Sequence, residues 1–397
     1  MARWNEVVLG FVKCGLLFGI MFAVLGIFFL NCIGPWLNSP NYKPPHLSFI
    51  GDPSTSMGIA FETPEACNAT VYYGLSETDL NMSQTDNQLR TLHFFNLTNL
   101  LPNMTYYYLI NASERNYAFM NVVETFRTAP PFGSKDPIHF AVLGDTRPDI
   151  FGMTKHKELL DLIKPRKPDF ILNVGDIVLG PTYTHQWDRF FYEIGDIAKN
   201  IPYMVSMGNH EHHEAGGEAD AGRTYLKYMH FPGVEEYYAF NYSNACFISM
   251  NIQSEESITA EQLDWLNKTL TNANNSVEIN WIIVYFHTPP YCTTESHPVI
   301  VERVVEPYLV PFKVDLVLAG HHHHYERLEI DGISYVISGG GGAELDLFVT
   351  PTEWTSSIAN TYQFCDILIN GTVLNLYCVD YNNLIIDQLT LTAWRNV

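Results

Sequence analysis

Apolar runs that end in an aspartate, an asparagine or a histidine recur along the last two thirds of this chain. They read IHFAVLGD, DFILNVGD, PYMVSMGNHE, WIIVYFH and VDLVLAGHHH. Short apolar runs next to glycine are typical of buried strands. Helical spacing predicts helices at 153–162, 184–199 and 298–309, and a capping box that starts at Thr259 predicts another. Alternating strands and helices indicate an α/β domain, here over residues 131–397.

A different pattern precedes this domain. The short alternating segments SMGIAFET, ATVYYGL, RTLHFFNL, TYYYLINA and VVETFRTAP are separated by Gly, Pro, Asn and Asp, with no helical spacing between them. This pattern predicts an all-β sandwich over residues 46–130. The C-terminal third again reads as strands, in RLEIDGISYVISGG, YQFCDILI, VLNLYCVDY and NLIIDQLTLTA.

The N-terminus has the pattern of a membrane segment. No charged residue occurs in GLLFGIMFAVLGIFFLNCI, which is long enough for the roughly 20 residues of a spanning helix. Arg3 and Lys13 precede it, and Trp4 and Trp36 flank it. We expect an uncleaved signal anchor at 14–34, with residues 1–13 inside and a linker at 35–45. A cleavable signal peptide is the competing interpretation, which the long apolar region and the lack of a small-residue cleavage site disfavour.

Composition narrows the classes of function. At 397 residues with 47% hydrophobic and 16% charged residues, the chain is long enough for two folded domains and is not a disordered protein. A net charge of −21, with no basic run, excludes nucleic-acid binding as a main role. Nine Asn-x-Ser/Thr sites, all after the apolar segment, favour a glycosylated exterior or lumenal protein. They are Asn68, Asn81, Asn96, Asn103, Asn111, Asn241, Asn267, Asn274 and Asn370.

The cysteines suggest one disulfide. Cys365 and Cys378 flank the hairpin turn Asn370-Gly371 and could lie opposite each other. No Cys-x-x-Cys spacing occurs, so a zinc knuckle or a thiol redox site has no support.

The polar residues that close the apolar runs form five short motifs. They are Gly144-Asp145, Gly175-Asp176, Gly208-Asn209-His210-Glu211, Tyr285-Phe286-His287 and Gly320-His321-His322-His323. Carboxylate, amide and imidazole groups together suit borderline or hard metals such as Zn, Mn or Fe, and one carboxylate can bridge two ions. The motifs therefore predict a hydrolase site with two metals.

This order of motifs resembles the calcineurin-like metallophosphoesterases and, within them, the purple acid phosphatases. The stretch His323-His324-Tyr325-Glu326-Arg327 is similar to the purple acid phosphatase form. Leu100-Leu101-Pro102-Asn103-Met104-Thr105-Tyr106 resembles a corner of fibronectin type III domains. The resemblance implies a four-layer α/β-β/α sandwich that follows a fibronectin type III-like domain.

The resemblance also implies roles for individual residues. The first metal ion would be bound by Asp145, Asp176 and His323, and the second by Asp176, Asn209, His287 and His321. His210 would protonate the leaving group, and His297 would reach the phosphate from another side. Because residues alternate along a run, we expect His322 and His324 to be exposed or to lie behind the ligands.

The activity that this resemblance implies is hydrolysis of a phosphate ester. Two metals lower the pKa of a bound water and neutralise the phosphoryl oxygens. A monoester phosphatase is the first interpretation, and a phosphodiesterase or nucleotide pyrophosphatase is the second. A non-catalytic surface binding protein on the same scaffold is the third. The physiological substrate, the metal identity and the oligomeric state are left open.

Two positions depart from the family pattern. Purple acid phosphatases have an iron-binding tyrosine three residues after the second aspartate, where this chain has Leu179. The wider superfamily has a histidine two residues after the first aspartate, where this chain has Arg147. Arg147 either binds phosphate oxygens or pairs with an acid such as Asp149. Tyr183 is nearby in sequence and could replace the missing tyrosine.

The substitution at position 179 predicts a non-purple enzyme with a weaker or more exchangeable first metal, because a leucine side chain cannot bind a metal. The purified protein, loaded with iron, should lack the strong visible absorption that tyrosinate-bound ferric iron produces. An intense visible band of that kind would contradict this prediction.

Overall fold

The computed structural model describes residues 42–395 apart from 113–116, 150–151, 213–219 and 348. The predicted anchor at 14–34 and most of the linker lie outside the described residues. Within the described part, no helix is both long enough and apolar enough to cross a membrane.

The N-terminal domain is all-β. Its strands are β1 (Lys43–Ser48), β2 (Met57–Gly74), β3 (Met82–Leu97), β4 (Thr105–Ala112) and β5 (Val123–Arg127). They form one hydrogen-bonded network in the order β1-β2-β4-β5, with β3 also paired to β2. The two segments SMGIAFET and ATVYYGL, predicted as separate strands, are one irregular strand, β2, with register shifts near Cys67. Tyr106 accepts a hydrogen bond from the Leu101 N–H at 2.8 Å, which gives this corner the tyrosine link that its sequence suggested.

Two larger sheets form the second domain. The six-stranded sheet has the order β18-β17-β16-β6-β7-β8, and the seven-stranded sheet has the order β15-β13-β14-β12-β11-β10-β9. The strands of the first are β6 (Ile138–Leu143), β7 (Phe170–Asn173), β8 (Tyr203–Val205), β16 (Gln363–Asn370), β17 (Val373–Asp380) and β18 (Ile385–Thr392). Those of the second are β9 (Tyr238–Tyr242), β10 (Ala245–Ser249), β11 (Trp281–Tyr285), β12 (Leu316–Ala319), β13 (Tyr325–Ile330), β14 (Ile333–Ser338) and β15 (Thr355–Ala359).

The two sheets pack face to face through apolar side chains. Phe140 of β6 meets Phe247 of β10 edge-on, with ring centroids 5.2 Å apart. The next residue of β10, Ile248, points to the opposite face of the seven-stranded sheet and packs with Leu266 of a helix. This alternation follows from the two-residue period of a strand, and it explains why these runs are apolar throughout.

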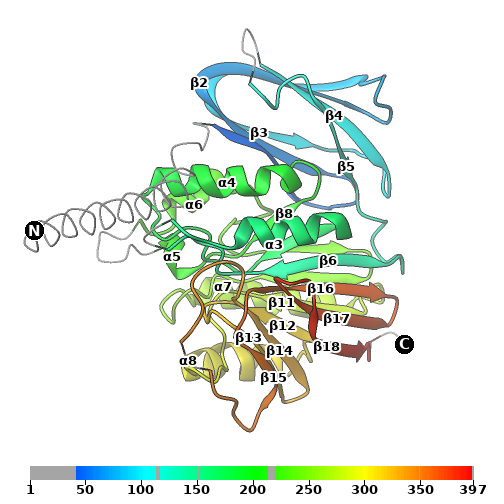
Figure 1. Cartoon of the computed structure of the whole chain (residues 1–397). Coiled ribbons are helices and arrows are strands. Elements are labelled where there is room, and N and C mark those ends of the chain that lie inside the picture. Colours follow the sequence, from blue (N-terminus) through cyan, green and yellow to red (C-terminus); the bar gives the residue numbers. More distant parts are fainter. Residues whose placement is uncertain (1–41, 113–116, 150–151, 213–219, 348, 396–397) are drawn as a thin grey trace, which may run out of the picture.

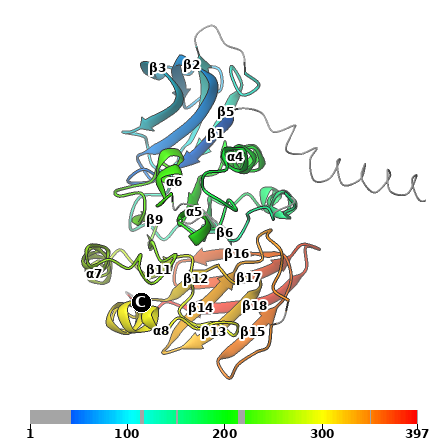
Figure 2. The ribbon, with the colours of Figure 1, turned by 90° about the vertical axis from the view of Figure 1, so that its left-hand side faces the viewer.

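Helices lie outside the sheet pair (Figure 1, Figure 2). The helices α3 (His156–Ile163) and α4 (Thr184–Ala198) pack against the six-stranded sheet, while α7 (Ala260–Asn275), α8 (Pro298–Ile300) and η3 (Val301–Leu309) belong to the other side. Short helices occur at η2 (Lys164–Arg166), α5 (Asn209–His212) and α6 (Arg223–Tyr228). The predicted helices are confirmed, with small shifts at their ends. The complete four-layer description stays a prediction.

Helix α4 also joins the two domains. Lys43 of β1 is buried and forms ion pairs with Glu62 and, at 2.7 Å, with Asp188 of α4. Tyr108 of β4 donates a hydrogen bond to the carbonyl of Lys199 at 2.8 Å. Buried charged groups need such partners, so these contacts fix the N-terminal domain against α4.

The suggested disulfide is not present. Cys365 of β16 and Cys378 of β17 are opposite each other in register, as expected, but both are free thiols in the described structure. Both are fully buried, and their thiols lie 3.7 Å from the Ser338 hydroxyl and the Gln363 Oε1 respectively.

Candidate metal centre

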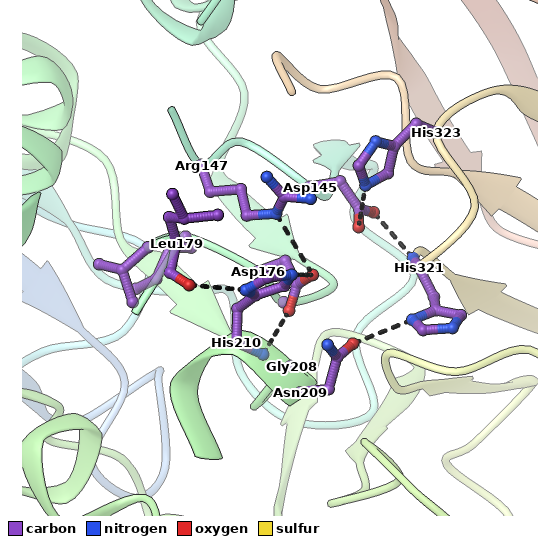
Figure 3. Close-up of polar contacts among 12 residues, drawn as sticks. Asp145, Arg147, Asp176, Leu179, Gly208, Asn209, His210, His321 and His323 are labelled. Atoms are coloured by element: carbon purple, nitrogen blue, oxygen red, sulfur yellow. Dashed lines mark hydrogen bonds and ion pairs between the residues drawn. The ribbon is translucent and has the colours of Figure 1, made fainter. Parts of the chain in front are cut away.

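The polar motifs converge because parallel strands end at the same edge of a sheet. Asp145, Asp176 and Asn209 follow β6, β7 and β8, which are adjacent in the six-stranded sheet. His287 and His321 follow β11 and β12, which are adjacent in the other. Since the two sheets are stacked, these ends meet, and Figure 3 shows most of their side chains directed into one space.

Tight turns redirect the side chains after the strands. Asp145, Asp176 and His321 have positive φ angles of 56°, 57° and 71°. This left-handed conformation costs free energy in non-glycine residues and often marks functional sites. Gly208 is required next to Asp176, because a Cβ there would lie 2.2 Å from the Asp176 Oδ1.

Asp176 lies at the centre of the cluster. Its Oδ1 is 3.3 Å from the His287 Nε2 and accepts a hydrogen bond from the His210 N–H at 3.0 Å. The Asn209 Oδ1 is 2.9 Å from both the His287 Nε2 and the His321 Nδ1. The predicted ligands of the second metal are therefore in mutual contact.

Asp145 and His323 form the other side of the cluster. The Asp145 Oδ2 accepts a hydrogen bond from the His321 N–H at 2.8 Å, and its Oδ1 lies 3.5 Å from the His323 Nε2. This Oδ1 is buried and has no hydrogen-bond partner. A buried carboxylate oxygen without a partner is costly, and a cation would satisfy it. The carboxylate, amide and imidazole donors present thus fit a metal centre.

The electrostatics of the cluster agree with a site for positive charge. Burial opposes ionisation of Asp176, but His287, His210 and Arg147 outweigh burial and hold the pKa of Asp176 well below its usual range. Burial also opposes protonation of His287, but Asp176 raises the pKa of His287 to about 9. The His287 Nδ1 donates to the Val174 carbonyl at 2.8 Å, so its Nε2 faces the cluster.

The predicted catalytic residues surround the same space. The His210 Nδ1 donates to the Leu179 carbonyl at 2.7 Å, which leaves its Nε2 3.8 Å from the Asp176 Oδ2. The Arg147 Nε lies 3.8 Å from the same oxygen. The ring of His297 is 5.9 Å from that of His321, and its buried Nε2 has no hydrogen-bond partner.

Tyr183 does not replace the missing tyrosine. Its ring is 42% exposed, covers Gly180 and stacks against His185 at 5.9 Å. Among the described residues, no hydrogen bond, ion pair or ring contact joins Tyr183 to a predicted ligand. His322 and His324 are 8% and 0% exposed, so of the two expected positions, exposed or behind the ligands, the structure has the second.

One residue of the motifs had no predicted role. Glu211 is fully buried, and its carboxylate accepts hydrogen bonds from four backbone N–H groups at 2.7 to 3.2 Å. These donors are Asp176, Ile177, Val178 and Gly208. Glu211 therefore fixes the turn that carries Asp176. Its position at the end of the Gly-Asn-His-Glu motif was the only sequence signal for this role.

Comparisons with known proteins agree with this geometry. Residues 138–325 match the family profile of calcineurin-like phosphoesterases, and residues 43–128 match that of the purple acid phosphatase N-terminal domain. Residues 138–325 therefore form a calcineurin-like phosphoesterase domain. With the domain at 43–128, the chain is similar to the purple acid phosphatases. The purple acid phosphatases use a dinuclear metal centre.

The sequence is also similar to individual purple acid phosphatases. A purple acid phosphatase of Glycine max is 30% identical over 63% of this chain and 55% of the relative. The Fe(3+)-Zn(2+) purple acid phosphatase 12 of Arabidopsis thaliana is 27% identical over 78% of this chain and 69% of the relative. The chain spans 53% of Arabidopsis purple acid phosphatase 15, and similar shares of the other relatives that match most strongly.

Solved structures share the fold. A purple acid phosphatase from yellow lupin (Lupinus luteus) seeds has a TM-score of 0.74 at 19% identity, over 89% of this chain and 75% of that one. GAP50, the anchor in the inner membrane complex of Plasmodium, has a TM-score of 0.50 at 18% identity, over 65% of this chain and 89% of that one.

We expect the substitution Glu211→Gln to weaken metal binding by about 10- to 100-fold, because its amide NH2 would oppose two of the four backbone donors and release the Asp176 turn. It should also lower the free energy of unfolding by about 1–3 kcal/mol. Calorimetric metal titration and denaturant unfolding measure the two effects. Glu306→Gln, which removes the same charge from an exposed residue, is the matched control. Equal metal affinity in the two variants would contradict the role of Glu211.

Proposed function

We propose that this chain is a phosphatase that hydrolyses phosphate monoesters at a dinuclear metal centre. The observation that carries this proposal is the convergence of the six predicted ligands around buried carboxylates, one of which has an unpartnered oxygen. The calcineurin-like phosphoesterase domain supports the reaction type. The similarity to purple acid phosphatases supports a monoester as the substrate.

The residues divide into ligands and substrate-binding groups. Asp145, Asp176 and His323 would hold the first ion, and Asp176, Asn209, His287 and His321 the second. The bound ions supply a nucleophilic water of lowered pKa and neutralise the phosphoryl oxygens. The net charge of −21 does not prevent phosphate binding, because close charges outweigh distant screened ones.

Three further side chains can act on the substrate. The Nδ1–H of His210 is held by the Leu179 carbonyl, which directs its Nε2 to the site, and in the doubly protonated ring this Nε2–H would be donated to the leaving oxygen. Arg147 has a buried Nε without a hydrogen-bond partner, which suits a non-bridging phosphate oxygen. The unpartnered Nε2 of His297 suits a second such oxygen.

A non-catalytic binding role is the second candidate, and one observation favours it. Arg147 places a fixed positive charge 3.8 Å from Asp176, beside a first site that lacks the tyrosine ligand at position 179. Two similar proteins are consistent with this role: probable inactive purple acid phosphatase 1 of Arabidopsis thaliana, and GAP50, the anchor in the inner membrane complex of Plasmodium. Metal analysis separates the two candidates: near two ions bound by the six residues favours the enzyme, and none favours the binding protein.

The activity is tested with nitrophenyl phosphate as monoester and diester, with the protein loaded with Zn, Mn or Fe. Monoester turnover that Asp176→Asn abolishes would support the phosphatase. A preference for the diester would favour the phosphodiesterase interpretation. A folded protein without turnover under any metal would reject the enzyme.

For an active enzyme, we expect His210→Gln to lower kcat by roughly 100-fold or more for an alkyl phosphate. The loss should be much smaller for nitrophenyl phosphate, whose leaving group needs little protonation. Steady-state kinetics on both substrates measure this difference, with His230→Gln, a half-buried histidine next to the N-terminal domain, as control. An equal loss on both substrates would assign His210 to positioning rather than proton transfer.

We also propose that residues 14–34 anchor the chain in a membrane with both folded domains on the exterior or lumenal side. The positions of the glycosylation sites support this orientation, because eight of the nine acceptor asparagines are exposed and Asn68 is half-buried. Mass spectrometry of the mature N-terminus tests the anchor, since a start after residue 30 would reject it. Sugar at these asparagines in a glycosylating host would support the orientation.

A further inference from the structure

A second cluster of metal-binding side chains lies behind the phosphatase site. Cys292, His324 and Glu326 offer three ligand atoms that lie within 4.8 Å of one another. The Cys292 Sγ is 3.9 Å from the His324 Nε2, which is 3.4 Å from the Glu326 Oε2. The three residues are 6%, 0% and 0% exposed. None of them is a predicted ligand of the dinuclear centre.

The separations fit a single ion. A tetrahedral ion with bonds of about 2.3 Å to sulfur and about 2.0 Å to nitrogen and oxygen holds its ligand atoms roughly 3.3–3.6 Å apart. The separations of 3.9 Å and 3.4 Å are within a few tenths of an ångström of this spacing, and the Cys292 and Glu326 ligand atoms lie within 4.8 Å of each other. A small inward movement of the Cys292 side chain would close it.

Hydrogen bonds around the cluster orient its side chains in the way that is usual for metal ligands. The His324 Nδ1 is 2.7 Å from the Asp346 Oδ2, so the ring donates its Nδ1–H to that carboxylate and its Nε2 faces Cys292 and Glu326. Glu326 accepts hydrogen bonds from the Thr293 N–H at 3.0 Å and from the Thr355 hydroxyl at 2.8 Å. A carboxylate behind a histidine and donors behind a ligating carboxylate are regular features of protein metal sites.

We propose that Cys292, His324 and Glu326 bind a third metal ion of the zinc type, separate from the dinuclear centre. A thiolate, a neutral imidazole and a carboxylate carry two negative charges, which neutralise a buried divalent ion. The thiolate favours zinc over the hard ions Mg and Ca. A water completes the tetrahedral set.

The position of this ion gives it a structural role. Cys292 lies on the loop after β11 that carries His287 and His297, while His324 directly follows His323 at the start of β13. Thr294 of the same loop is hydrogen-bonded to the His322 Nδ1 at 2.7 Å. An ion at Cys292 would therefore link the two segments that carry the three proposed histidine ligands, His287, His321 and His323.

The test is metal analysis and cobalt spectroscopy of the full chain. Cobalt-loaded wild type should show the intense near-ultraviolet absorption of a thiolate-to-cobalt transition, which the oxygen and nitrogen ligands of the dinuclear centre cannot produce. Zinc-loaded Cys292→Ser should contain about one ion per chain less than wild type, and its cobalt form should lose that absorption. Asp176→Asn should keep the absorption, which makes this test independent of the phosphatase proposal.

Cys246→Ser is the matched control, because Cys246 is also a buried free thiol but burial raises its pKa to about 12. It should leave the metal content and the cobalt spectrum unchanged. Wild-type protein without the thiolate band would overturn the proposal even if Cys292→Ser fails to fold. So would an equal zinc content in wild type and Cys292→Ser, which would assign His324, Glu326 and Asp346 to a metal-free ionic network.

Discussion

The arrangement of this domain depends on holding two carboxylates, Asp145 and Asp176, in the interior where two sheets meet. Burial of two like charges is costly, and the chain offsets that cost with backbone donors, histidines and an arginine. Glu211 adds a third buried carboxylate, which is satisfied by four N–H groups of the adjoining turns. The strained turns at Asp145 and Asp176 persist because these contacts over-determine them.

Local charge, rather than the charge of the whole chain, decides what this site can bind. The protein carries a net charge of −21, yet Arg147 lies 3.8 Å from Asp176 and four histidines surround the same carboxylates. Leu179 contributes its backbone carbonyl to His210 but no ligand atom from its side chain. The proposed first metal position would therefore have fewer protein ligands than the family pattern implies, while the proposed second would have its full set.

The four consecutive histidines after β12 contribute side chains to two separate clusters. The His321 ring faces Asn209 and the His323 ring faces Asp145, whereas His322 and His324 face Thr294 and Cys292. In this bent segment alternate residues face opposite sides, so four consecutive residues supply both clusters. A change at Cys292 or His324 would therefore be expected to shift the proposed ligands His321 and His323.

The apolar runs and their terminal residues were sufficient to predict the strands, the main helices, the family and the six residues that converge. These features are local, since each depends on the hydrophobic period of a segment or on the residue that closes it. The sequence did not determine the continuity of β2, the burial of His322 and His324, the role of Glu211 or the outward position of Tyr183. Each of these depends on which distant segment packs against the residue, and only the tertiary structure decides that. The pairing of Cys292 with His324, across 32 positions of chain, is decided in the same way.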